Sequence, residues 1–136
     1  MLTDLIILKK LELDFVIIEF YAPDLIVYHY KPQTHLTWQM IQQVAKETNE
    51  MINYKKCFMC SVIGEDVTID KAVREKGTTP EALAYTKASA IVQNSLAHRI
   101  LGNFIIKVQR PSVPTKLFND IHVALTWLNK LRLQEQ

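Results

Sequence analysis

The segment from residue 95 to residue 127 constrains the fold of this chain most strongly. Ser95 is a candidate helix N-cap, and the apolar residues after it recur at three- and four-residue spacing. This spacing predicts an amphipathic helix whose apolar stripe is formed by Ile100, Leu101, Phe104, Ile105 and Val108. Phe104 and Ile105 are expected to pack on a sheet, as is Leu125 of the last helix. Pro111 and Pro114 end the helix, because proline lacks a backbone N–H and disfavours helical conformation in the residue before it. Residues 115–118 have room for only a short strand, and Asn119 or Asp120 caps a last helix with Ile121, Leu125, Leu128 and Leu131 on one face.

The earlier segments alternate in the same way between strand and helix patterns. Residues 11–20 and 25–30 predict two strands joined by a turn at Pro23, and Thr37 caps a helix that runs to about Asn53. Residues 57–63 and 88–92 are apolar runs typical of strands buried on both faces. Asp70 caps a short helix that ends at Gly77, and Pro80 begins another.

The resulting order is β-β-α-β-α-β-α-β-α, when the two short helices count as one crossover. It predicts a single α/β domain over residues 1–136, with a core from about 11 to 133. We expect a mixed, mainly parallel sheet with an antiparallel edge hairpin, covered by helices. Phe58, Val62, Ile91 and Leu117 are expected on its central strands.

Composition excludes several classes of protein. Hydrophobic residues make up 49% of the chain and charged residues 22%, which is typical of a globular domain. The net charge of +2 argues against a dedicated nucleic-acid binder. The apolar run at residues 1–8 contains Asp4 and precedes Lys9 and Lys10, so we expect neither a signal peptide nor a membrane span. Two cysteines without an export signal indicate reduced thiols and a cytoplasmic location.

The order of elements and the amino-acid sequences of residues 101–104 and 114–118 resemble those of the STAS-like (SpoIIAA-like) domains, the fold of bacterial anti-sigma factor antagonists. The chain is most similar to small, uncharacterised single-domain bacterial members of that group. The resemblance implies a regulatory or binding function without catalysis.

The resemblance also points to a candidate partner or switch region at Thr68, Asp70 and Lys71. In the family, a phosphorylated serine follows an aspartate at the start of a helix. Asp70 matches the aspartate, but Lys71 stands where the serine would be, and Thr68 is the only hydroxyl nearby. Glu65 and Asp66 would repel a phosphate there, so we expect no phosphate switch.

No residue pattern predicts catalysis, a cofactor or a metal site. Cys57 and Cys60 form a C-x-x-C within a strand, where residues three apart point to opposite faces, so we expect two buried structural thiols. His29, His35, His98 and His122 show no zinc-ligand spacing, and His98 and His122 are placed near the polar sides of their helices.

A basic stripe, defined as Arg99, Lys107, Arg110 and Lys116, is a candidate anion-facing surface. The alternative, which we favour from the sequence, is a solvated helix face with cations near the helix C-terminus.

Three functions follow from these observations. The leading hypothesis is a protein-interaction module of the antagonist type without the usual phosphoserine, which predicts an exposed apolar patch near the Asp70 helix. The alternative is a carrier or sensor of a small apolar or anionic ligand, which predicts an enclosed pocket between helices and sheet. An enzyme is the third. A protein partner is expected, a homodimer stays open, and no nucleic acid is expected.

Overall fold

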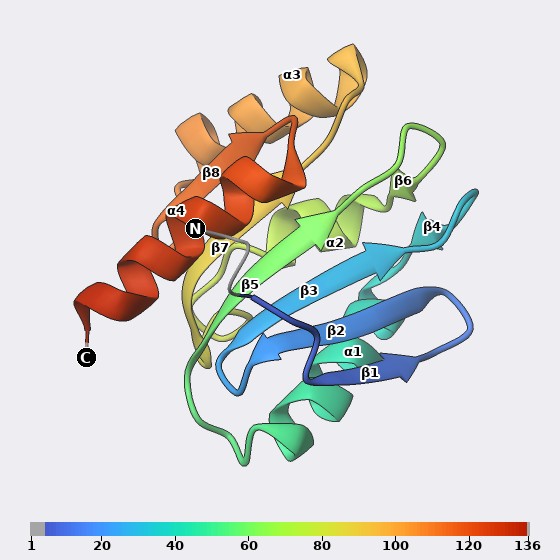
Figure 1. Cartoon of the computed structure of the whole chain (residues 1–136). Helices are drawn as coiled ribbons and strands as arrows, with labels where there is room; N and C mark the ends of the chain where they lie inside the picture. The colour runs from blue at the N-terminus through green and yellow to red at the C-terminus, as the bar shows by residue number, and fades with distance from the viewer. Residues whose placement is uncertain (1–4, 136) are drawn as a thin grey trace.

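In the computed structural model, which describes residues 5–135, six strands form one sheet in the order β1-β2-β3-β5-β7-β8 (Figure 1). The apolar run at residues 1–8, predicted to be neither a signal peptide nor a membrane span, begins with residues 1–4, which lie outside the described residues. The strands are β1 Lys9–Glu12, β2 Val16–Ala22, β3 Leu25–Tyr30, β5 Cys57–Val62, β7 Thr86–Val92 and β8 Thr115–Phe118.

The sheet is mixed and mainly parallel, as predicted. Strands β3, β5, β7 and β8 run parallel, whereas β1–β2 and β2–β3 are antiparallel. Two details differ from the prediction. The strand expected over residues 11–20 is two strands, because the chain turns at residues 13–15, where the Leu13 N–H donates to the Val16 carbonyl at 2.8 Å. Leu117 lies on β8, an edge strand, and not on a central one.

The helices are α1 Trp38–Met51, α2 Lys71–Lys76, α3 Leu96–Phe104 and α4 Ile121–Gln134, and α3 continues into a π-helical turn, η2 Ile105–Gln109. Side-chain caps start three of them. Thr37 accepts from the Met40 N–H, Ser95 from the His98 N–H and Asp120 from the His122 N–H. These caps confirm the predicted starts of α1, α3 and α4.

The helix predicted to begin at Pro80 is wrong. Residues 77–85 form successive turns. The Leu83 N–H donates to the Thr79 carbonyl at 3.0 Å, which closes one helical turn, but helix formation is cooperative and a single turn is too short to be stable by itself. A second small sheet, which the sequence did not predict, pairs β4 His35–Leu36 with β6 Thr68–Ile69 in parallel.

Each face of the main sheet has its own hydrophobic core. On one face, α1 packs through Val44 against Ile18 and Ile26. On the other, α4 packs through Leu125 and Leu128 against residues of β3, β5 and β7 that include Phe58, as Figure 1 shows for the arrangement of the elements. The predicted apolar face of α4 is therefore confirmed.

The predicted packing of α3 is wrong in part. Leu101 and Ile105 are half-buried, but Ile100, Phe104 and Val108 are exposed. The side of α3 that faces the body of the protein carries Gly102, which is buried against Leu117 of β8. A helix held this closely by a glycine presents its larger apolar side chains elsewhere.

Candidate functional site

A pocket of about 220 Å³ lies between the α1 face of the sheet and the helices that cover it. Its floor is formed by side chains of β3, β5 and β7, including Tyr28, Met59 and Ile91. The walls come from α1, α2, η2 and the turns at 77–85. Ala45 and Tyr85 line it and are exposed, so the pocket reaches the surface between α1 and these turns.

The pocket exists because its covering elements are short or carry small side chains. The segment that follows α2 is a series of turns and not a helix, so it covers this part of the sheet thinly. Several lining residues have little or no side chain to fill the space: Ala45, Ser61, Gly77, Ala82 and Ser89. Since protein interiors are otherwise close-packed, space of this size left between layers is a candidate binding site.

The lining is mainly apolar, with a few polar groups that are already paired. The buried Tyr28 hydroxyl donates to Thr48 Oγ1 at 3.0 Å, and Thr86 Oγ1 donates to Met59 Sδ at 3.0 Å. Burial raises the pKa of Tyr28 and the pKa of Tyr30 above the usual value of a phenol, so both rings stay neutral at physiological pH. The floor therefore offers neutral aromatic and aliphatic surface.

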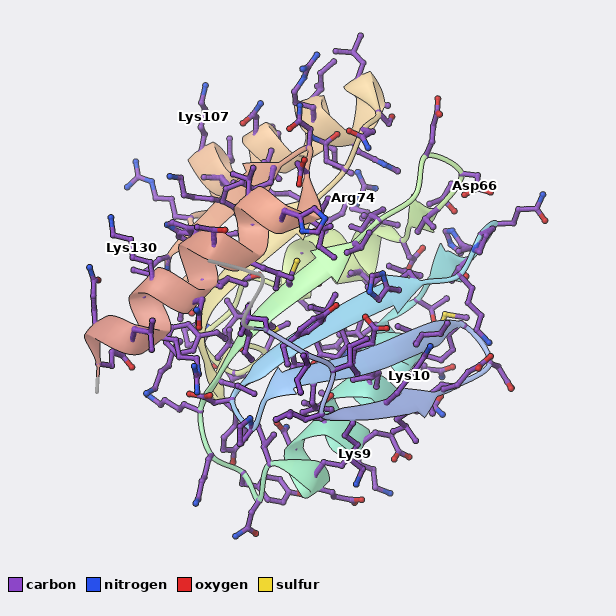
Figure 2. All side chains as sticks on the ribbon, in the orientation of Figure 1. Lys9, Lys10, Asp66, Arg74, Lys107 and Lys130 are labelled. Carbon is purple, nitrogen blue, oxygen red and sulfur yellow. The ribbon has the colours of Figure 1, made fainter. Side chains whose placement is uncertain are left out.

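Arg74 of α2 is the charged side chain among the residues that line the pocket. Its Nε is buried and has no hydrogen-bond partner among the described residues. A buried N–H on a cation is costly to leave unpaired. Because this atom is out of reach of solvent, a ligand in the pocket would meet Arg74 through the rest of its guanidinium group. In Figure 2, Arg74 lies within the outline of the fold, whereas Lys107 on the α3–η2 segment extends into solvent.

The two cysteines lie on opposite faces of β5, as predicted. Cys57 belongs to the α1-face core and lines the pocket, and Cys60 belongs to the α4-face core. Both are free and buried, and burial raises the pKa of each thiol to about 12. Neutral thiols are poor nucleophiles and poor metal ligands at physiological pH.

Two of the histidines, His29 and His98, pair with groups other than the cysteines. His29 pairs with Glu19 at 2.7 Å between neighbouring strands. His98, expected near the polar side of its helix, instead faces inward, where its Nε2 lies 2.7 Å from the Val67 carbonyl oxygen. In residues 5–135, no group of three or more His, Cys, Asp or Glu side chains is arranged to hold a metal ion.

The predicted switch residues do come together, beside the N-terminus of α2. Thr68 of β6 is exposed, and its Oγ1 lies 2.7 Å from His35 Nδ1. The same imidazole has its Nε2 3.7 Å from a carboxylate oxygen of Asp70. Asp70 occupies the N-cap position of α2 without a side-chain capping bond, and Lys71 is exposed.

The basic stripe divides into two parts. Arg99, Lys107 and Arg110 are exposed along α3 and η2. Lys116 lies on β8, where its Nζ is 5.6 Å from the centre of the Trp127 ring, within the range of a cation–π contact. Lys116 is exposed as well, so all four members of the stripe are open to solvent.

Sequence reasoning missed Arg74 and the pocket residues. The small side chains that leave the space are scattered over α1, β5, β7 and the turns, and their separation in the sequence carries no periodic signal. In the sequence, Arg74 is an ordinary cation near the end of a short helix, and only the burial of its Nε in the structure distinguishes it from the other surface cations.

Within the part of the chain that the structure describes, no helix has the length and apolar character needed to cross a bilayer. Comparison with curated proteins and with solved structures found no match. A family model described as a domain of unknown function, DUF7793, matches residues 20–132. The match covers most of the chain, and the protein therefore belongs to this family.

Proposed function

We propose that this member of the DUF7793 family is a non-catalytic binding module that holds one small, mainly apolar molecule in the pocket between α1, α2 and the sheet. The observation that carries the proposal is the pocket itself, about 220 Å³ of space bounded largely by aliphatic and aromatic side chains. A space of about 150 Å³ in a protein core already admits benzene or xenon. The pocket therefore has room for a substituted ring or a short hydrocarbon chain.

Arg74, the charged residue of the pocket lining, supports a ligand with one acceptor group, such as a carboxylate. Such a group would accept from the guanidinium of Arg74, while the apolar part of the ligand lies against the floor. Hydrogen bonds to a charged partner contribute about 1.5–3 kcal/mol, so this one interaction would separate acids from neutral analogues by roughly tenfold or more.

The regulatory role implied by the STAS-like resemblance is part of the same proposal. The helix α2 lines the pocket with Val73 and Arg74, and its N-terminus adjoins Asp70 and Thr68. A ligand under α2 would stabilise this short helix, and with it the surface where the resemblance places partner contacts. We assign this role to a reducing cytoplasm, because both thiols are free.

The test uses two probes, ethylbenzene and 4-ethylbenzoate, followed through the methyl NMR signals of the wild-type protein. We expect both to shift the methyl signals of pocket residues such as Val73 and Ile91 and to leave those of the α4-face core unchanged. Ser89→Leu, which fills the space from the floor, should abolish both effects. Ala97→Phe, on the exposed side of α3, is the matched control and should bind as the wild type does.

A second variant tests whether the pocket prefers acids, independently of whether it binds a ligand. Arg74→Gln should weaken 4-ethylbenzoate about tenfold or more and leave ethylbenzene unaffected. Equal affinity of the acid for both proteins would refute the role of Arg74. Absence of pocket shifts with either probe at millimolar concentration would refute the binding function, and so would shifts that persist in Ser89→Leu.

A further inference from the structure

The outward side of the α3–η2 segment carries a row of four large apolar side chains. Leu96, Ile100, Phe104 and Val108 follow one another at four-residue spacing, and their exposed fractions are 63%, 61%, 53% and 61%. Single exposed apolar residues are ordinary, but residues four apart on a helix are neighbours, so these four form a continuous surface. We call it the α3–η2 apolar row.

Contacts on the opposite side of α3 fix the orientation of the helix, so that the row faces solvent. A Cβ built at Gly102 would lie 2.8 Å from a methyl carbon of Leu117, so no larger side chain fits on the inner side of α3 without movement. His98, on the same inner side, contacts the Val67 carbonyl with its Nε2. Because these contacts fix the inner side of α3, the row has no partner within the described residues, although burial of apolar side chains is favourable.

The charge beside the row has a single sign. Arg99, Lys107 and Arg110 are exposed along one flank, and within residues 5–135 none of them forms an ion pair. From residue 82 to residue 119 the sequence contains no Asp or Glu. The surface that complements this segment is therefore apolar along its centre and acidic along one side.

The charge and shape of the α3–η2 apolar row indicate which kind of partner it fits. In a symmetric dimer through this face, the same cations of two copies would meet without a carboxylate between them, which opposes a second copy. The cations lie on one flank of the row only, so a partner needs carboxylates on one side only. The row spans about 18 Å, or roughly three helical turns, which is a length that a helical segment can cover. A row at four-residue spacing is also the ridge that enters the groove of a crossing helix in the commonest class of helix packing.

We propose that the α3–η2 apolar row is the docking surface for a helical segment of another protein that carries apolar side chains with Asp or Glu beside them. The partner helix crosses α3, buries Ile100 and Phe104 at the centre of the contact, and places its carboxylates against Arg99 and Lys107. This surface is separate from the ligand pocket, so the proposal does not depend on the ligand.

The experiment places a photo-cross-linking residue, p-benzoylphenylalanine, at Asn103 of the full chain, which is exposed between the row and the cations. The same residue at Lys130, an exposed position on α4, is the control (Figure 2). After irradiation of the cells in which the protein is native, mass spectrometry identifies the cross-linked segment. We expect a cross-link specific to position 103, to a segment with apolar residues at helical spacing and with Asp or Glu alongside.

Two sets of variants then test the contacts. Ile100→Asp and Phe104→Asp should reduce the cross-link about tenfold or more, and Val123→Asp, at an equally exposed apolar position on α4, should not. Arg99→Glu should reduce it as well, and Lys substitution of the partner's carboxylates should restore it. Unchanged thermal unfolding of each variant excludes loss of fold.

Three outcomes would overturn the proposal. Cross-links to a second copy would show a homodimer face, and cross-links to lipid alone would show a membrane-facing surface. Equal yields at positions 103 and 130 would show a solvated helix face without a partner.

Discussion

The clearest stability prediction compares two phenylalanine truncations that differ in burial. Phe58 on β5 is 2% exposed, within the core shared by α4 and the sheet, and Phe104 on α3 is 53% exposed. The chemical change to alanine is the same at both positions. If the orientation of α3 is correct, the two variants should differ strongly in free energy of unfolding.

The magnitudes follow from the area that each ring removes from water. Truncation of a buried phenylalanine costs about 3–5 kcal/mol, because the lost burial is joined by a cavity that the core does not refill. A fully buried aromatic side chain removes about 150–250 Å² from water, so Phe104 removes roughly half of that, or ~2–3 kcal/mol at ~25 cal/mol per Å² as an upper value. Alanine recovers about 0.5 kcal/mol of helix propensity, and water fills the space. The expected cost of Phe104→Ala is therefore about 1–2 kcal/mol.

Urea unfolding followed by far-UV circular dichroism gives both free energies from the midpoints at a common slope. A loss of about 3 kcal/mol or more in Phe104→Ala would refute the exposed orientation of α3 and return Phe104 to the core. Equal losses in the two variants would have the same consequence. A change of slope in either variant would show that truncation altered the denatured or native ensemble, so the comparison is made at unchanged slope.

Three further predictions concern a cap, the thiols and the predicted switch. Asp120→Ala should lower the free energy of unfolding by about 1 kcal/mol, because the carboxylate caps α4, whereas Asp66→Ala in an exposed loop should have little effect in the same urea titration. Cys57 and Cys60 should react with a thiol reagent only after unfolding. Because folding raises the pKa of both thiols from 9.0 to about 12, their contribution to stability should be complete below about pH 9 and decline as pH rises toward 12. Replacement of both by alanine should flatten that decline, and an unchanged alkaline profile would contradict the argument. Thr68 should carry no substantial phosphate in protein from its native cells, and mass spectrometry that finds it would restore the conventional switch.

The class of fold and most of its elements follow from local patterns in the amino-acid sequence. Hydrophobic periodicity, caps and prolines are local signals, and local hydrogen bonds respond to them directly: Ser95, Thr37 and Asp120 cap helices as predicted. The apolar runs predicted at 57–63 and 88–92 lie on β5 and β7, which carry buried residues on both faces, since only a covered sheet accommodates such runs.

Contacts between distant segments set which side of α3 faces the core and where space remains between the layers. The apolar pattern of α3 predicts a buried stripe, but Gly102 allows the closest approach to β8, and Phe104 is thereby left in water. The pocket likewise depends on small side chains from distant segments, such as Ala45 and Ser89, that meet only after folding. Periodicity records how polar each side of a helix is, whereas packing depends on the shapes of the surfaces that meet, and those shapes are set by residues far apart in the chain.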